Sequence, residues 1–217
     1  MIFVHSVDVI DLMLKGLMIG IIASAPMGPV GILVVQRTLN KGRWYGFATG
    51  VGAALSDIAY AIITGLGMSL VFDFIEKPST MLYLRLIGSV MLFLFGLWMF
   101  KSKPAEPHAP SGKLGSYTHN GLTGFLLTLS NPLIVFLFVA LYARLNFVAP
   151  NHLWEQTLGY AAILAGSLLW WACLTSALRT MKDRLSMSTI SFFNRLLGAL
   201  VMAISGIGLI LTVIGKL

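Results

Sequence analysis

Two prolines interrupt an apolar stretch that is long enough to cross a lipid bilayer. No ionisable residue occurs from Gly16 to Val35, a run of 20 residues, which is about the length that a transmembrane helix needs. Within this run lies Pro26-Met27-Gly28-Pro29. Proline lacks a backbone N–H and clashes with the preceding turn, so the helix should break near its middle. Broken backbone at this depth is tolerated where it lines a cavity, and secondary transporters hold their substrates in such cavities.

The composition is that of an integral membrane protein. Of the 217 residues, 57% are hydrophobic and 11% are charged, and the mean hydropathy is +0.87, whereas soluble domains carry about 25% charged residues. The net charge of +7 does not indicate nucleic-acid binding, because the basic residues lie in short loops where membrane topology explains them. The single cysteine, Cys173, excludes a disulfide within the chain. The N-terminal stretch lacks the basic segment of a cleavable signal peptide.

Six apolar runs are long enough to span the hydrocarbon core as helices, at about 1.5 Å per residue. They are Leu12–Val35, Trp44–Phe72, Met81–Phe100, Gly121–Ala143, Thr157–Leu178 and Arg195–Gly215. We therefore expect an all-α integral membrane protein with six transmembrane helices. The whole chain, residues 1–217, should form a single membrane domain, and its longest loop should cover about 101–120.

The basic residues predict the orientation, because Lys and Arg favour cytoplasmic loops. Most of them follow spans one, three and five: Arg37, Lys41, Arg43, Lys101, Lys103, Lys113, Arg179, Lys182, Arg184 and Arg195. The acidic residues gather mostly at the other side: Asp8, Asp11, Asp73, Glu76 and Glu155. Loops 1–2, 3–4 and 5–6 should thus be cytoplasmic, with both termini outside.

The two halves of the chain resemble each other. Arg85-Leu86-Ile87-Gly88 in span three matches Arg195-Leu196-Leu197-Gly198 in span six at an offset of 110 residues, and Gly96 and Gly206 keep that offset. Pro26 and Pro132 stand 106 apart, in spans one and four. An odd number of spans per copy inverts the second copy, so we expect an inverted 3+3 repeat, about 12–100 and 121–215, with broken helices in spans one and four.

Asp57 is the acid that lies well inside a predicted span. A charged carboxylate at this depth is costly, so the residue is a functional candidate. Small residues accompany it at helical spacing: Gly46, Gly50, Ala53, Ala61 and Thr64. Because small residues admit a neighbouring backbone, Asp57 should face another helix or a cavity. Four apolar residues fall largely on other faces and can meet lipid: Val51, Leu55, Ile58 and Ile62. Asp57 could carry a proton, or it could be a structural acid bonded to a backbone N–H or to a hydroxyl freed by a broken helix.

The two breaks supply the other candidate binding groups. A half-helix that starts near Pro29 would present free N–H groups and a positive dipole end, which suit a carboxylate. We therefore assign a substrate-binding role to Pro26, Met27, Gly28, Pro29 and Gly31, against the alternative of a kink used for packing. In span four, Asn131 and Pro132 form the second candidate element. Asn131 could touch the substrate, or it could satisfy backbone that Pro132 leaves unpaired.

These motifs resemble those of the LysE/RhtB family of amino-acid exporters. The resemblance covers nearly the whole chain and is most specific in its first third: Pro26-Met27-Gly28-Pro29, the basic turn from Arg37 to Arg43, and Gly46, Gly50 and Gly52 before Ser56-Asp57. Met27 stands where the family usually has its first proline. Ser130-Asn131-Pro132 resembles the Asn-Pro element of the family's fourth span. The resemblance implies export of amino acids or related small metabolites from the cytoplasm, driven by the proton gradient, and it also suggests homodimers.

The expected protein is thus a secondary exporter in the bacterial plasma (inner) membrane, with Asp57 as the proton-coupling residue. A neutral amino acid is preferred over a cationic one, because one intramembrane acid is few for both cation binding and proton coupling. No cofactor, metal site, nucleic-acid partner or enzymatic activity is expected, since no catalytic constellation, metal-ligand spacing or nucleotide loop occurs. The alternatives are a metal or inorganic-ion exporter on the same scaffold and a non-transporting membrane assembly protein.

Overall fold

The computed structural model describes residues 8–26, 28–74, 78–101, 115–131, 133–149, 152–180 and 187–214. Met27 and Pro132, both predicted site residues, lie outside the described residues. Within the described part the chain forms eight α-helices: α1 (Val9–Ser24), α2 (Pro29–Lys41), α3 (Arg43–Phe74), α4 (Pro78–Lys101), α5 (Tyr117–Leu129), α6 (Leu133–Leu145), α7 (Leu153–Thr180) and α8 (Met187–Val213).

The helices coincide with the six apolar runs that the sequence predicts. By length and hydropathy, three segments can each cross a membrane: Arg43–Ser69 of α3, Leu153–Arg179 of α7 and Asn194–Val213 of α8. Two further spans form if each bent pair is one span, with a bend of 79° between α1 and α2 and of 73° between α5 and α6. Among the described residues, the apolar segment of α4 covers Leu86–Lys101. The protein is therefore a multi-pass membrane protein with two bent helix pairs, and the arrangement of six spans with broken helices in spans one and four stays a prediction.

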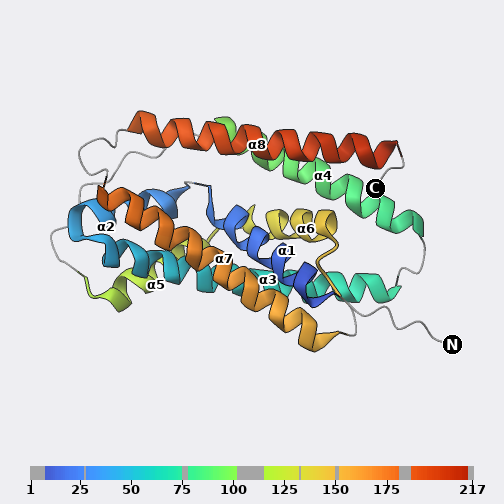
Figure 1. The fold of residues 1–217 in the computed structure, drawn as a ribbon, viewed down its shortest axis with the longest axis horizontal. Coiled ribbons are helices and arrows are strands. Elements are labelled where there is room, and N and C mark those ends of the chain that lie inside the picture. The colour runs from blue at the N-terminus through green and yellow to red at the C-terminus, as the bar shows by residue number, and fades with distance from the viewer. Residues whose placement is uncertain are drawn as a thin grey trace.

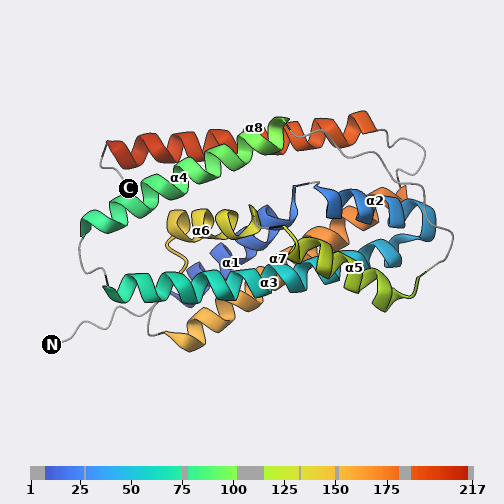
Figure 2. The ribbon, with the colours of Figure 1, turned by 180° about the vertical axis from the view of Figure 1, so that it is seen from behind.

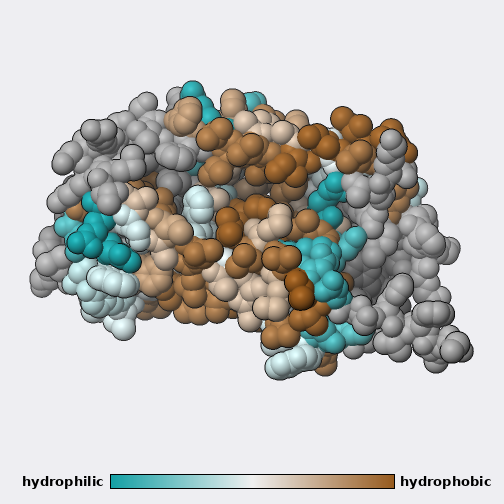
Figure 3. Space-filling model, viewed as in Figure 1, coloured by the Kyte–Doolittle hydropathy of each residue, from teal (hydrophilic) through white to brown (hydrophobic). Residues whose placement is uncertain are grey.

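The outer surface agrees with insertion in a bilayer. Hydrophobic side chains cover the middle of the face seen in Figure 3, and hydrophilic ones gather toward its two ends. Many large apolar side chains point outward, among them Leu66, Leu200 and Ile207, each more than half exposed. Such a surface suits lipid, because an apolar face of this size is rare on monomeric soluble proteins.

The helices pack in pairs that bring the two breaks together. α4 and α8 cross each other and form one layer, and α1 lies along α7 while α5 lies along α3 in the other layer (Figures 1 and 2). Glycines allow these close contacts. A Cβ on Gly20 of α1 would lie 2.0 Å from the Ile163 carbonyl oxygen of α7, and a Cβ on Gly124 of α5 would lie 2.1 Å from the Thr49 carbonyl oxygen of α3.

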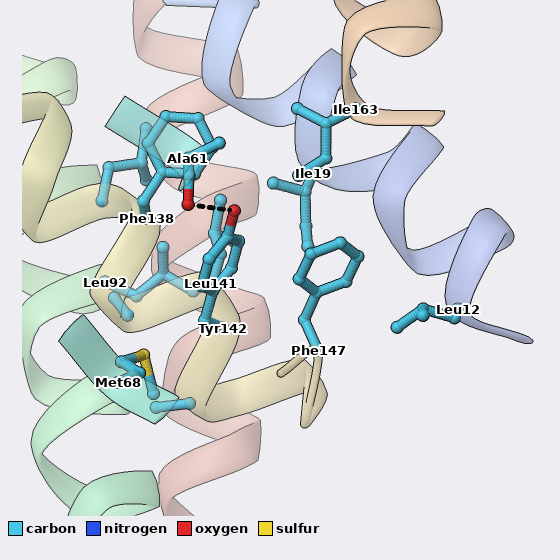
Figure 4. Packing of buried hydrophobic residues seen from close by; sticks show 13 residues of the cluster. Leu12, Ile19, Ala61, Met68, Leu92, Phe138, Leu141, Tyr142, Phe147 and Ile163 are labelled. Atoms are coloured by element: carbon cyan, nitrogen blue, oxygen red, sulfur yellow. Dashed lines mark hydrogen bonds between the residues drawn. The ribbon is translucent and has the colours of Figure 1, made fainter. Parts of the chain in front are cut away.

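The buried core surrounds α6, the second half of the broken fourth span. Tyr142 of α6 is buried and donates its hydroxyl hydrogen bond to the Ala61 carbonyl of α3, at 3.0 Å. Figure 4 shows this bond beside Phe138, with Leu92 of α4 and Ile19 of α1 nearby. The core therefore holds α6 against three other helices and so positions the break at its start.

Candidate functional site

The two broken spans meet at a cavity of about 70 Å³. Pro26, Gly28 and Pro29 of the first break line it, and Asn131 of the second break lines it from the other half of the chain. Asp57 of α3 also lines this cavity. The structure therefore brings together the predicted elements that are more than 100 residues apart in the sequence.

Asp57 is buried and bonded to the end of α1. Its side chain is 3% exposed, and Ser24, the last residue of α1, donates a hydrogen bond from Oγ to Asp57 Oδ2 at 3.2 Å. None of the described residues that line the cavity has a basic side chain. A carboxyl group in such a place is costly to ionise without a cationic partner. The carboxyl group of Asp57 is therefore placed so that it can be neutral when protonated and can bind a cation when ionised.

The small-residue stripe of α3 faces inward, as the sequence predicts. Gly46, Gly50, Ala53, Ala61 and Thr64 are all buried, like Asp57 between them. Leu55 and Ile62, which the same periodicity directs toward lipid, are 48% and 38% exposed, whereas Val51 and Ile58 are partly buried. Helical spacing thus correctly predicts the buried face of α3 but only two of the four residues expected to meet lipid.

The first break leaves backbone donors at the start of α2. Pro29 is the first residue of α2, and the N-cap residue Gly28 has no side chain to accept from the first-turn N–H groups. The turn itself is closed by Gly28 N–H, which donates to the Pro26 carbonyl at 2.9 Å. An uncapped helix N-terminus beside a cavity is suited to a carboxylate. Gly31 is buried in α2 but is not among the residues that line the cavity.

Asn131 both caps α6 and lines the cavity. Its Oδ1 accepts a hydrogen bond from Leu133 N–H at 3.2 Å, and its carbonyl accepts from Ile134 N–H at 3.3 Å. The backbone role that the sequence left open is thus present. The Nδ2 group of Asn131 remains a second donor that a ligand in the cavity could use.

Several cavity-lining residues were not predicted as site residues, and two of them carry buried polar atoms without a partner in the part of the chain that the structure describes. Trp171 of α7 and Thr128 of α5 are buried, and neither Trp171 Nε1 nor Thr128 Oγ1 has a hydrogen-bond partner among the described residues. Trp171 lies against Gly50, where a Cβ would be 2.5 Å from its ring. The sequence feature that could have indicated this position is the glycine-rich stripe of α3, because a glycine admits a large ring from a neighbouring helix. Buried unpaired donors of this kind call for a partner such as a ligand or water.

The cavity can hold small polar groups but is contracted. Its volume is far below the roughly 300–1,000 Å³ of typical ligand pockets. A substrate of amino-acid size therefore requires the lining helices to move apart. Within the described part of the chain, no group of three His, Cys, Asp or Glu side chains could hold a metal ion.

Fold and site together define a helical membrane protein with a cavity between two bent helix pairs. The family model of LysE type translocators matches residues 21–212, and the chain therefore belongs to this family. It is 28% identical over 179 residues to the "Putative amino acid efflux protein YcgF" of Bacillus subtilis (strain 168), covering 81% of this chain and 84% of that protein. It is also 27% identical over 152 residues to the "Uncharacterized membrane protein YahN" of Escherichia coli (strain K12), covering 67% of this chain and 65% of that protein. No solved structure matches the chain.

Proposed function

We propose that this translocator is a proton-coupled exporter of neutral amino acids or related small metabolites. The observation that carries the proposal is the cavity that joins both broken spans to the buried carboxyl group of Asp57. Membership of a family of translocators and similarity to a protein named for amino acid efflux support transport rather than catalysis.

The proposed mechanism assigns a role to each part of the cavity. The substrate carboxylate binds the N–H groups of Val30 and Gly31 in the first turn of α2, because Gly28 N–H is bonded to the Pro26 carbonyl and Pro29 has no N–H. Asn131 Nδ2 donates from the opposite side. Asp57 either holds a proton or pairs with the substrate ammonium group. Because one carboxylate cannot do both at once, proton entry would release the substrate. Met27 and Pro132 complete the two breaks in this proposal.

The helix pairing supports an inverted repeat of three spans. Exchanging the two halves, about 12–100 and 121–215, interchanges α1 with α5, α3 with α7 and α4 with α8. That exchange turns the α1–α7 pair into the α5–α3 pair and maps the α4–α8 pair onto itself, and all of these pairs are in contact. An inverted repeat around a midplane site is a transporter architecture.

The two halves also differ in a way that supports alternating access. α6 packs against α4, whereas in the described part of the chain its counterpart α2 does not contact α8. We propose that the two halves exchange these arrangements during transport, which opens the cavity to one side and then to the other. The α2 end, with Lys41, Arg43 and Arg179, would face the cytoplasm of a bacterial plasma membrane, and both termini would lie outside.

Purified protein in proteoliposomes with an imposed pH gradient tests the transport proposal. We expect gradient-dependent movement of neutral amino acids that exceeds the movement of cationic ones. Replacing Ala53, which lines the cavity and is 2% exposed, by Leu should block transport by filling the cavity. The matched control is Ala203→Leu on the exposed face of α8. Movement of metal ions instead, or equal rates in the two variants, would refute the proposal. Cross-linking in membranes tests the homodimer.

A further inference from the structure

A second pocket, remote from the cavity, lies at the turn between α2 and α3. It measures about 550 Å³ and is lined by Lys41 and Gly42 of the turn, Arg43 and Trp44 of α3, and Arg179 of α7. Three of these side chains are cationic, and none of the described residues that line the pocket carries a carboxylate. Figure 1 shows the turn near the end of α7. The proposed transport path uses none of these residues, and membrane topology requires basic residues on this side but not that they converge on one pocket.

The pocket has features that suit an oxyanion. α3 begins at Arg43, directly after Gly42, so the first N–H groups of a 32-residue helix lie there. Gly42 has a φ of 105°, a conformation that side-chain-bearing residues rarely adopt, and this sharp turn sets α2 and α3 around the pocket. Arg43 Nε is buried and has no hydrogen-bond partner among the described residues. An arginine with a free buried donor can bind a phosphate oxygen.

An apolar groove adjoins the basic pocket, and Trp44 lines both. The groove measures about 700 Å³ and runs between α3 and α5, with Phe47, Ala48 and Val51 on one side and Gly121 on the other. From Trp44 to Val51 it extends about 10 Å along α3, at about 1.5 Å per residue. The guanidinium carbon of Arg43 lies 4.6 Å from the centre of the Trp44 ring. The basic pocket and the apolar groove thus meet at Trp44, and tryptophan is enriched at membrane interfaces.

We propose that this composite site binds an anionic phospholipid. The headgroup phosphate lies among Lys41, Arg43 and Arg179, and an acyl chain lies in the groove between α3 and α5. Basic pockets between transmembrane helices suit such headgroups. A soluble phosphate would use the basic pocket alone and would leave the groove empty, which is why the lipid fits the whole site. The proposal goes beyond the transport function and requires only that the protein spans the membrane.

Purified protein in detergent allows a test that does not depend on transport. Bound lipid is measured by native mass spectrometry, and thermal unfolding is followed with added phosphatidylglycerol, phosphatidylcholine or inorganic phosphate. We expect phosphatidylglycerol to be retained and to raise the unfolding temperature, and the other two to have little effect. If inorganic phosphate stabilises the protein as much as phosphatidylglycerol does, the site binds a soluble anion and the proposal of a bound lipid is wrong. Equal retention of phosphatidylglycerol and phosphatidylcholine would overturn charge recognition.

Matched variants test the two parts of the site separately. Arg179→Gln should weaken phosphatidylglycerol binding about fivefold, the effect of one basic residue near a lipid headgroup, whereas Arg195→Gln, an exposed arginine of α8 outside the pocket, should not. Ala48→Leu should reduce lipid retention by filling the groove, and Ala203→Leu on α8 is its control. If Arg179→Gln and Ala48→Leu both retain lipid like their controls, the proposal is wrong.

Discussion

Replacing Gly20 by Ala should loosen the contact that positions α1 against α7. A Cβ there would lie 2.0 Å from the Ile163 carbonyl oxygen and 2.8 Å from Ser167 N, whereas ordinary contacts begin near 3.4 Å. The helices must therefore separate by about 1.4 Å, the difference between 3.4 and 2.0 Å. Overpacking of this kind costs about 1–3 kcal/mol. The same shift lengthens the hydrogen bond from Ser167 Oγ to the Gly20 carbonyl, 3.2 Å long, which is worth about 1 kcal/mol.

The free energy of unfolding of Gly20→Ala should thus fall by about 2–4 kcal/mol. Equilibrium unfolding in detergent micelles measures the loss. Gly206→Ala is the matched control, because a Cβ at Gly206 meets no atom within 4 Å. Since Ala is the better helix former, the control should be unchanged or slightly more stable. Transport by Gly20→Ala should also slow, because Ser24 lies one helical turn further along α1. Equal stability of the two variants would refute the proposed close packing of α1 on α7.

Substitutions at three positions, Ser24, Gly28 and Asn131, test single groups at the cavity. Ser24→Ala removes the hydrogen bond to Asp57, worth about 1.5–3 kcal/mol if the carboxylate is charged, so transport in proteoliposomes should slow about tenfold or more; Ser24→Thr should keep most activity. Gly28→Ser should cap α2 without a clash, so its thermal stability should be equal or slightly higher. Its transport should be slower, because the serine hydroxyl competes with the substrate carboxylate for the first N–H groups of α2. Equal transport rates in Gly28→Ser and Gly28→Ala would contradict this. Asn131→Ala should lower the free energy of unfolding by about 1 kcal/mol, because it removes the cap of α6. Asn131→Asp keeps the hydrogen bond from Leu133 N–H and should therefore lose transport but not stability. Normal transport by Asn131→Asp would show that Asn131 only caps α6 and does not bind the substrate.

The helices and the first break follow from local sequence. Apolar runs of span length and the Pro-x-Gly-Pro run determine most of the helix positions, and the periodicity of small residues correctly predicts the buried face of α3. These features depend on backbone geometry and on residue size, both of which can be read from neighbouring residues.

The contacts inside the cavity could not be predicted in this way. The bond between Ser24 and Asp57, and the position of Trp171 against Gly50, depend on how α1 and α7 pack on α3. The dual role of Asn131 also depends on the angle between α5 and α6, 73° in the structure. These contacts join residues that are distant in the chain, and the spacing of residues along a single sequence does not predict which distant helices pack together.

The central claim is that Asp57 couples proton movement to substrate movement, and Asp57→Asn tests it most directly. The measurement compares two modes in the same proteoliposomes: uptake of a neutral amino acid driven by a pH gradient, and exchange of that amino acid at equal concentrations without a gradient. Asparagine keeps the size of the side chain but cannot carry a proton. We predict that Asp57→Asn abolishes gradient-driven uptake and retains exchange. Gradient-driven uptake at the wild-type rate would contradict the account.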